Sequence, residues 1–436
     1  MNNNPNQTRT PNGQQNRPQT GQRPPMQGQR PPMQGQRPPM QGQRPPMQGQ
    51  RPPMQGQRPP MNGPQNRRPA PKKSNKTLII ALVSILVIAI IGGLVAMTIA
   101  LVNNSNGPDT TSTGGGSSSG KKPGGSKPPA DNGPEVSYSI TLPSATQSGN
   151  YLSGISSDCE NIEGISSAAA VLVDVNANTC IAQKNADTKI HPASMTKVMT
   201  LIVACENISK PGRLLTVEQW MVDYAIANGG SGVMAFKAGE QISVESALYL
   251  ISNTSDTIAC LLISKYLAGD EKSFADMMNA KANQLGLTQT HFVNSTGLDI
   301  IGQSDYNYTT CREMAAIMNC AMNNPVVKDL LTSRSHGIPI YVDGEQTRSG
   351  IAYSSWIGKD RLDNQPKISG TSLEVLGGKT GWETIPRACF VTAAQDASTG
   401  KQYICVVVGR ITPDQAEVKE AQSTTDTRTI YKNYAK

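Results

Sequence analysis

The stretch Pro192-Ala-Ser-Met-Thr-Lys197 decides how the rest of this chain is interpreted. Ser194 and Lys197 are three residues apart, so on a helix their side chains lie on the same face. The apolar residues that follow recur with a helical period, and proline is well suited to the start of a helix. We therefore expect Ser194 in the first turn of a buried helix.

A helix start suits a nucleophile that works with its own base. The amino end of a helix carries partial positive charge, which favours an oxyanion. Burial lowers the pKa of a lysine, so a neutral Lys197 amine can take the proton of the Ser194 hydroxyl. The pair therefore predicts a catalytic serine and its lysine base.

The Ser-x-x-Lys pattern occurs four times, at Ser118, Ser119, Ser194 and Ser398. Ser118 and Ser119 lie in a Gly/Ser run, and Ser398 lies in a polar segment typical of a turn. Only Ser194 is followed by apolar residues with a helical period, so among these four serines only Ser194 is predicted to be catalytic.

Charge divides the chain into two unlike parts. The net charge is +8, but residues 1–76 hold 13 Lys and Arg and no acidic residue, which leaves 27 basic and 32 acidic residues in the remainder. The folded part is therefore slightly acidic, which argues against a nucleic-acid-binding surface.

Residues 1–77 form a Pro-, Gln- and Arg-rich tail in which Gln-Gly-Gln-Arg-Pro-Pro-Met repeats from Gln27 to Met61. Two prolines per repeat exclude a helix, so we expect disorder with polyproline II character. A cytoplasmic partner that recognises the Pro-rich tail is one interpretation, and a solvated tail without a specific partner is the other.

Residues 78–102 contain no charge over 25 residues, enough for about 38 Å of helix against a hydrocarbon core of about 30 Å. Lys and Arg cluster on its amino side, which predicts a retained single-pass anchor in the cell membrane with a cytoplasmic N-terminus. Residues 103–136 are a Gly/Ser/Pro-rich linker, and residues 137–436 are expected to form an extracellular domain.

All eight cysteines lie between Cys159 and Cys405, in the part predicted to be exported. An even number there permits disulfides, although several would also serve as small buried apolar residues. Cys311 and Cys320 should share one helix about 13 Å apart, so they should not pair with each other.

The order of elements suggests an α/β fold. A β-hairpin is expected first, helices follow the Ser194 helix, strands return late, and a helix closes the chain. The expected ranges are 169–175 and 179–183 for the hairpin, 217–227, 244–252, 257–267, 272–285 and 310–322 for the helices, 373–379, 389–394 and 403–408 for the strands, and 417–431 for the last helix. Both ends of the domain would then build one sheet, with a helical insertion between them and a cleft at the junction.

The first late strand ends in Gly377-Gly-Lys-Thr-Gly-Trp382. A lysine and a threonine on a strand can hold a carboxylate, and the glycine lets the backbone come close to it. Lys379, Thr380 and Gly381 are therefore candidates to hold a carboxylate.

Ser194-x-x-Lys197 and Lys379-Thr-Gly381, in this order, resemble the penicillin-recognising serine peptidases, specifically the D-alanyl-D-alanine carboxypeptidases. The segments 185–197, 237–240, 285–287 and 291–299 resemble that family as well. The resemblance implies a β-lactamase/DD-peptidase-like α/β fold. Its central antiparallel sheet is flanked by helices, and the active site lies at the junction with an all-helical subdomain.

One motif departs from the family pattern. Aligned on Asp256, the family's Ser-x-Asn becomes Asn253-Thr-Ser255, with amide and hydroxyl exchanged. Residues two apart in an extended loop face the same way, so Asn253 and Ser255 are both expected to reach the cleft.

By resemblance, Ser194 attacks the D-Ala-D-Ala peptide bond of a peptidoglycan stem peptide, Lys197 takes its proton, and Ser255 or Asn253 completes the relay. Lys379 and Thr380 hold the terminal carboxylate, and the backbone N–H groups of Ser194 and Trp382 form the oxyanion hole. β-Lactams are the expected inhibitors. No cofactor or metal is expected, because the three histidines show no ligand spacing.

Two alternatives stay open. A class A β-lactamase would need Glu-x-x-x-Asn between the second and third motifs, and no glutamate in that interval has Asn four residues on, so penicillin hydrolysis should be slow. A catalytically impaired peptidoglycan-binding or scaffolding homologue is the second alternative, because the middle motif is altered.

Overall fold

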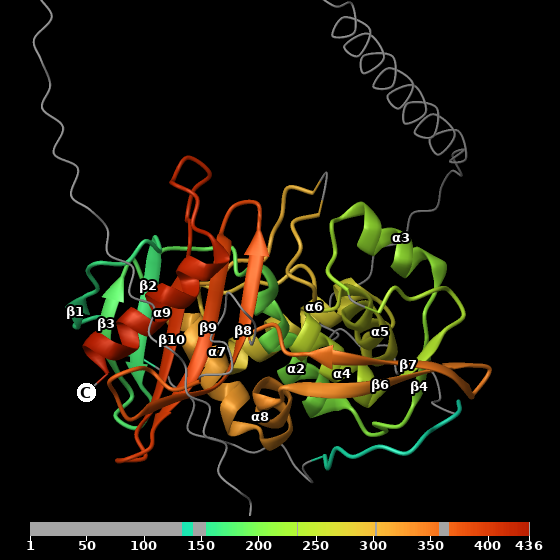
Figure 1. Ribbon diagram of the computed structural model, residues 1–436. Helices are drawn as coiled ribbons and strands as arrows, with labels where there is room; N and C mark the ends of the chain where they lie inside the picture. The colour runs from blue at the N-terminus through green and yellow to red at the C-terminus, as the bar shows by residue number, and fades with distance from the viewer. Residues whose placement is uncertain (1–132, 143–153, 233, 301–302, 357–365, 436) are drawn as a thin grey trace, which may run out of the picture. The chain divides into compact units, whose positions relative to one another are not determined.

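The computed structural model describes residues 133–142, 154–232, 234–300, 303–356 and 366–435 (Figure 1). All of them belong to one compact unit, Ser118–Lys436. The predicted tail (1–77), the predicted membrane span (78–102) and nearly all of the predicted linker (103–136) lie outside the described residues. Within the described part of the chain, no helix is both long and apolar enough to cross a membrane.

A six-stranded sheet draws its strands from both ends of the domain, as predicted. Its order is β1-β3-β2-β10-β9-β8, and β2 pairs with β10 across more than 200 residues of sequence. The strands are β1 (Glu160–Asn161), β2 (Ala169–Asp174), β3 (Thr179–Lys184), β8 (Leu373–Glu383), β9 (Arg387–Asp396) and β10 (Gln402–Val408).

The sheet is mixed, so the expectation of an antiparallel sheet is corrected at one edge. β1 pairs with β3 in parallel, whereas the other neighbours are antiparallel. β3 runs antiparallel to β2, with which it forms a hairpin, and parallel to β1 on its other side. A strand of two residues is too short to show a periodic pattern, so β1 could not be predicted.

Both faces of the central strands are covered. Along β2 and β10, alternate residues pack into two different apolar clusters, because successive side chains in a strand point to opposite faces. One cluster contains most of the helices and the other contains Ile430 and Tyr431 of the last helix. This arrangement explains why β2 and β10 appear in the sequence as continuous apolar runs.

The helices match the predicted ranges to within a few residues. They are α2 (Thr196–Asn207), α3 (Gln219–Ala227), α4 (Val244–Tyr249), α5 (Thr257–Ala268), α6 (Glu271–Gln284), α7 (Cys311–Asn323), α8 (Pro325–Thr332) and α9 (Glu420–Tyr434). Only α8 had no predicted counterpart. It begins directly after α7, with Asn324 capping its first turn and Pro325 at its first position.

The insertion is not all-helical, which corrects the predicted subdomain. A four-stranded sheet, β4-β5-β6-β7, lies within it. Its strands are β4 (Leu214–Thr216), β5 (Gln241–Ser243), β6 (Ser335–Val342) and β7 (Glu345–Tyr353). β4 and β5 have three residues each, too few for an alternating pattern, and β6 and β7 form a hairpin.

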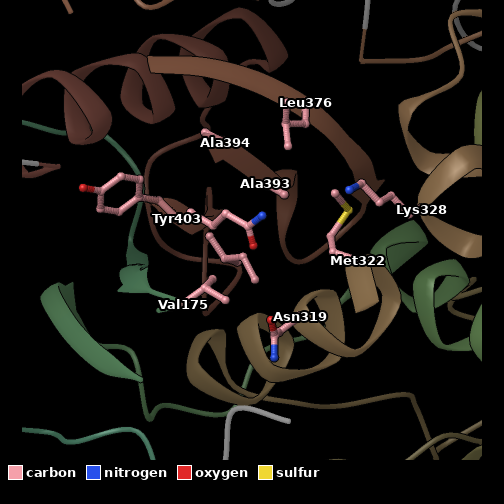
Figure 2. Close-up of a pocket in the computed structure, with 10 residues that line it drawn as sticks. Val175, Asn319, Met322, Lys328, Leu376, Ala393, Ala394 and Tyr403 are labelled. Carbon is pink, nitrogen blue, oxygen red and sulfur yellow. The ribbon is translucent and has the colours of Figure 1, made fainter. Parts of the chain in front are cut away.

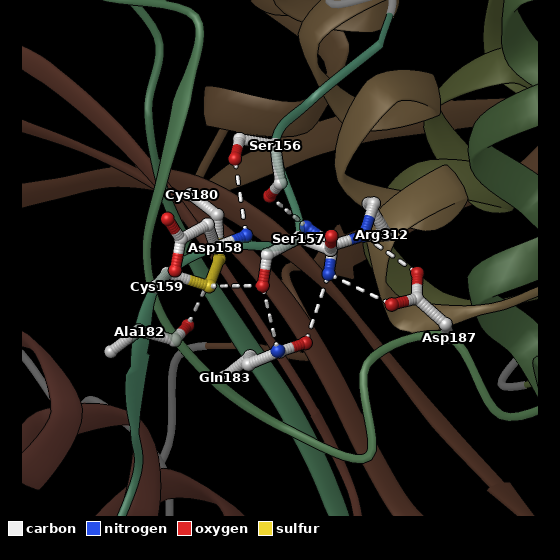
Figure 3. Close-up of a disulfide and its surroundings, with 9 residues drawn as sticks. All are labelled: Ser156, Ser157, Asp158, Cys159, Cys180, Ala182, Gln183, Asp187 and Arg312. Atoms are coloured by element: carbon white, nitrogen blue, oxygen red, sulfur yellow. Dashed lines mark hydrogen bonds and ion pairs between the residues drawn. A yellow bond between two sulfur atoms is a disulfide. The ribbon is translucent and has the colours of Figure 1, made fainter.

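A disulfide joins Cys159 to Cys180, with their Cα atoms 5.7 Å apart (Figure 3). Beside it, the Arg312 guanidinium donates to Ser156 O at 2.7 Å and pairs with Asp187. The disulfide and Arg312 together hold the segment before β1 against β3. The other six cysteines are buried and form no disulfide in the described part of the chain, so Cys311 and Cys320 on α7 do not pair with each other, as predicted.

β8 carries a bulge just before its glycine pair. The pairing register with β9 shifts between Val375 and Gly377, so Leu376 has no partner residue in β9. Its side chain lines a small, mostly apolar pocket (Figure 2). A Cβ at Gly377 would lie 2.5 Å from Leu331 O of α8. The glycine therefore lets α8 press against the strand that carries the Lys-Thr-Gly motif.

Candidate active site

Ser194 lies in a tight turn directly before α2. Residues Ala193–Met195 form a single 3-10 turn that runs into α2, so the predicted helix begins as 3-10 rather than α. Ala193 has φ +47°, a left-handed conformation that is strained for a residue with a Cβ. Gly297 packs against this turn, and a Cβ there would lie 2.0 Å from Ala193 O. Tertiary packing thus holds the turn in place.

Lys197 lies directly behind Ser194. Its Nζ is 3.0 Å from Ser194 Oγ and donates a 2.6 Å hydrogen bond to Thr296 O. Lys197 is fully buried, whereas Ser194 is partly exposed. The geometry is that of a nucleophile facing solvent with its base beneath it.

Burial lowers the pKa of the Lys197 amine. The Cys260 thiol and the carboxyl groups of Asp256, Glu271 and Glu383 oppose this effect. Burial also raises the pKa of Asp256 to about 6. Since burial is the largest cause, the neutral form of Lys197 becomes more accessible near neutral pH.

The middle motif is not an extended loop, so the predicted common direction of Asn253 and Ser255 is wrong. Residues Leu250–Thr254 form a π-helical turn, and Ser255 then adopts a left-handed conformation with φ +60°. The two side chains therefore separate. Asn253 is buried and its Nδ2 donates to Ala352 O of β7 at 3.1 Å. Ser255 lines a cleft in front of Ser194.

Three polar atoms of this motif are buried without a hydrogen-bond partner among the described residues. They are Asn253 Oδ1, Ser255 Oγ and Asp256 Oδ2. The other oxygen of Asp256 caps α5 by accepting from Ala259 N at 3.0 Å. Orphaned polar atoms are rare in protein interiors and need a reason, such as a ligand that is absent from the free protein.

The Lys-Thr-Gly motif runs along β8 beside the nucleophile turn. A Cβ at Gly381 would lie 3.2 Å from Ser194 N, so the glycine permits the close approach. Thr380 and Trp382 line the cleft, and the Trp382 side chain is 49% exposed. Lys379 is fully buried, and its Nζ donates to Thr380 O at 2.9 Å.

The cleft has an empty volume of about 960 Å³ and gathers most of the predicted residues. Ser194, Ser255, Thr380, Gly381 and Trp382 line it. Lys197, Asn253 and Lys379 lie beneath its surface, each fully buried.

Sequence reasoning missed two serines of the cleft, Ser231 and Ser355. The Ser231 hydroxyl donates to the backbone oxygen of Ser255, and the Ser355 hydroxyl accepts from Thr380 Oγ1 at 3.0 Å. Ser231 lies in the run Asn228-Gly-Gly-Ser-Gly232, whose composition marks a loop but not a site.

Ser398 and the three histidines are not among the residues that line this cleft. Ser398 is exposed in the β9–β10 turn, where its hydroxyl donates to Asp396 at 2.6 Å. Each histidine contacts a different residue: His191 lies 3.4 Å from Asp299, His336 stacks on Tyr249, and His291 lies beside Tyr308. Among the described residues, no group of three or more His, Cys, Asp or Glu could hold a metal ion.

The fold is that of the DD-transpeptidases. The crystal structure of the Streptomyces K15 DD-transpeptidase matches with a TM-score of 0.52 and 25% identity, over 62% of this chain and 97% of that one. A D-alanyl-D-alanine carboxypeptidase from Mycobacterium tuberculosis H37Rv matches with a TM-score of 0.50 and 20% identity, which supports the fold alone.

The family follows from the sequence comparison. The family model for Peptidase S11, D-alanyl-D-alanine carboxypeptidase, matches residues 157–412, which is more than half of the chain. The protein therefore belongs to the D-alanyl-D-alanine carboxypeptidase family, and the resemblance stated from its motifs is confirmed.

Two curated relatives from Escherichia coli K12 show the extent of the similarity. DacA is 31% identical over 223 residues, 50% of each chain. DacC is 35% identical over 263 residues, 59% of this chain and 60% of DacC. The chain thus spans about half of the length of the curated relatives that it matches.

Proposed function

We propose that the protein is a serine-type D-Ala-D-Ala carboxypeptidase that removes the terminal D-alanine from peptidoglycan stem pentapeptides through an acyl-enzyme on Ser194. The observation that carries the proposal is the buried Lys197 amine 3.0 Å from the Ser194 hydroxyl, at the base of an open cleft. Family membership supports the same substrate class.

The proposed reaction starts with proton transfer from Ser194 Oγ to the neutral Lys197 Nζ as the oxygen attacks the carbonyl of the D-Ala-D-Ala bond. Backbone N–H groups of Ser194 and Trp382 receive the oxyanion. The Ser255 hydroxyl passes a proton to the leaving amine and takes back the proton that Lys197 accepted from Ser194, so D-alanine departs and Lys197 is neutral again. Water then hydrolyses the ester and restores the Ser194 hydroxyl.

Ser255 is the better of the two relay candidates. Ser255 lines the cleft and its buried hydroxyl has no partner among the described residues, whereas the Asn253 amide does not line the cleft and donates to β7. Penicillins carry an amide and a carboxylate like those of the peptide, so they should acylate Ser194 as well. Slow hydrolysis would then leave a trapped, inhibited enzyme.

The test is mass spectrometry of a D-Ala-D-Ala pentapeptide incubated with the purified full-length protein. The expected product is the tetrapeptide plus free D-alanine, and Ser194→Ala should abolish it. Ser398→Ala is the matched control, because that serine has the same Ser-x-x-Lys pattern on an exposed turn. Intact pentapeptide, together with no labelling of the wild type by a fluorescent penicillin, would favour the scaffold alternative.

We also propose that residues 78–102 anchor the protein in the cell membrane, with residues 1–77 cytoplasmic and the catalytic domain outside. The charge asymmetry around the span supports this orientation. The Cys159–Cys180 disulfide fits an oxidising compartment. Protease added to intact cells should cleave the part after residue 102, and protection of peptides that contain Ser194 would contradict the orientation.

A further inference from the structure

Ser355 lies where three segments of the site meet. Its backbone N–H donates to Asn253 O at 2.6 Å, and Asn253 Nδ2 donates back to Ala352 O at 3.1 Å. Two hydrogen bonds therefore join the middle motif to the end of β7. On the other side, the buried Trp356 donates its indole N–H to Leu331 O at 3.2 Å. These contacts fix the backbone on both sides of Ser355.

Ser355 lines the cleft, and its hydroxyl lies next to that of Thr380. Thr380 Oγ1 donates to Ser355 Oγ at 3.0 Å, and both residues line the cleft with Ser194. Because Ser355 Oγ accepts this bond, its own proton is available to an acceptor in the cleft. No hydrogen bond among the described residues uses that proton.

An anion in the cleft would contact hydroxyl groups rather than the charged end of a lysine or arginine. No Lys or Arg occurs among the described residues that line the cleft. Lys379 is buried beneath Thr380 and donates to its backbone oxygen. Glu383, which also lines the cleft, is three residues further along β8, about 10 Å from Thr380. A carboxylate is therefore favoured at Thr380 and disfavoured at Glu383.

We propose that Ser355 is a substrate-binding residue whose hydroxyl, paired with that of Thr380, receives the C-terminal carboxylate of the substrate. This inference rests on the proposed function and adds a residue to it. The buried Lys379 supplies positive charge from beneath the two hydroxyls. Asn253 is then a positioning residue, because its amide holds the end of β7 that carries Ser355.

The test compares acylation of the full-length protein by benzylpenicillin and by its methyl ester, which lacks the negative charge. Ser355→Ala should slow acylation by the free acid about tenfold or more, the effect of one hydrogen bond to a charged group. Acylation by the ester should change little. Ser354→Ala is the matched control, because the Ser354 hydroxyl is buried without a partner among the described residues. Ser355→Thr should restore acylation by the acid.

A second measurement uses the peptide substrate. Ser355→Ala should raise KM for the D-Ala-D-Ala peptide while kcat changes less, since the lost contact holds the substrate. Equal losses with the acid and the ester, or no loss with either, would overturn the role of Ser355 and leave the proposed function intact. A wild-type protein that neither reagent acylates would overturn the proposed function itself, and this inference with it.

Discussion

Replacing Ser255 with alanine should separate activity from stability. The Ser255 hydroxyl is buried and has no partner among the described residues, so its removal breaks no hydrogen bond of the folded protein. An unsatisfied buried polar group costs about 1–3 kcal/mol, and part of that cost should disappear in Ser255→Ala. The left-handed conformation at φ +60° costs alanine about as much as serine. The free energy of unfolding should therefore stay constant or rise slightly.

Acylation should change in the opposite direction. A general acid–base group contributes about 10²- to 10⁴-fold to a rate, so Ser255→Ala should slow the acylation of Ser194 by that factor. The assay is the rate of labelling by a fluorescent penicillin, read beside urea unfolding of the same preparations. A folding defect would lower both quantities, whereas the loss of a relay hydroxyl lowers only the first.

Asn253→Ala is the comparison for the other half of the exchanged motif. It removes the amide that donates to Ala352 O, so it should lower the free energy of unfolding by about 1–2 kcal/mol. Ser255→Ala that labels at the wild-type rate would refute the relay assignment. Ser255→Ala that unfolds as easily as Asn253→Ala would refute the argument that its hydroxyl is unsatisfied.

Three further predictions follow from the same neighbourhood and from the disulfide. Burial raises the pKa of Asp256 from 3.8 to about 6, so the folded protein favours the protonated carboxyl. Protonation of Asp256 therefore stabilises the folded protein by about 3 kcal/mol below pH 4, and this stabilisation is lost as the pH rises through 6. Asp256→Asn should be the more stable protein at pH 7 and show no advantage at pH 4 in urea unfolding. Gly297→Ala should slow penicillin labelling at least 100-fold by pushing on the nucleophile turn, whereas Gly286→Ala, with nearly the same φ and no neighbour within 4 Å, should label normally. Removing the disulfide as Cys159→Ser with Cys180→Ser should cost about 3 kcal/mol and leave labelling of the folded protein unchanged, which thermal unfolding and labelling at low temperature will check.

Elements with a long periodic pattern were predictable, and short ones were not. α5 was expected at 257–267 and spans Thr257–Ala268, because twelve residues supply more than three turns of pattern. The β6–β7 hairpin has a local sequence signal, the Asp-Gly pair of a two-residue turn. Asp343-Gly344 connects its strands, and both residues have positive φ, as a two-residue hairpin turn requires. Applying that rule would have placed a sheet inside the insertion.

In the candidate site, contacts between residues close in the sequence were predictable, and contacts between distant residues were not. The contact between Ser194 and Lys197 depends on three residues of helical spacing, so the sequence alone predicts it. The contact between Lys197 and Thr296 O spans 99 residues, and the contact between Thr380 and Ser355 joins β8 to the turn that follows β7. No local pattern encodes either. The relation between Asn253 and Ser255 was predicted wrongly because a π-helical turn, which has no simple sequence signature, replaces the expected extended loop.

The distribution of unfavourable features supports the proposed function over the scaffold alternative. Asn253, Ser255 and Asp256 each hold a buried polar atom without a partner among the described residues, and Ser255 also has a left-handed backbone. Each such atom costs about 1–3 kcal/mol, and the backbone adds about 1–2 kcal/mol. A protein that only docks onto peptidoglycan has no physical need for this cost beside a serine and a buried lysine. A hydrolase does, because its polar groups are arranged for a substrate and a transition state that are absent from the free protein.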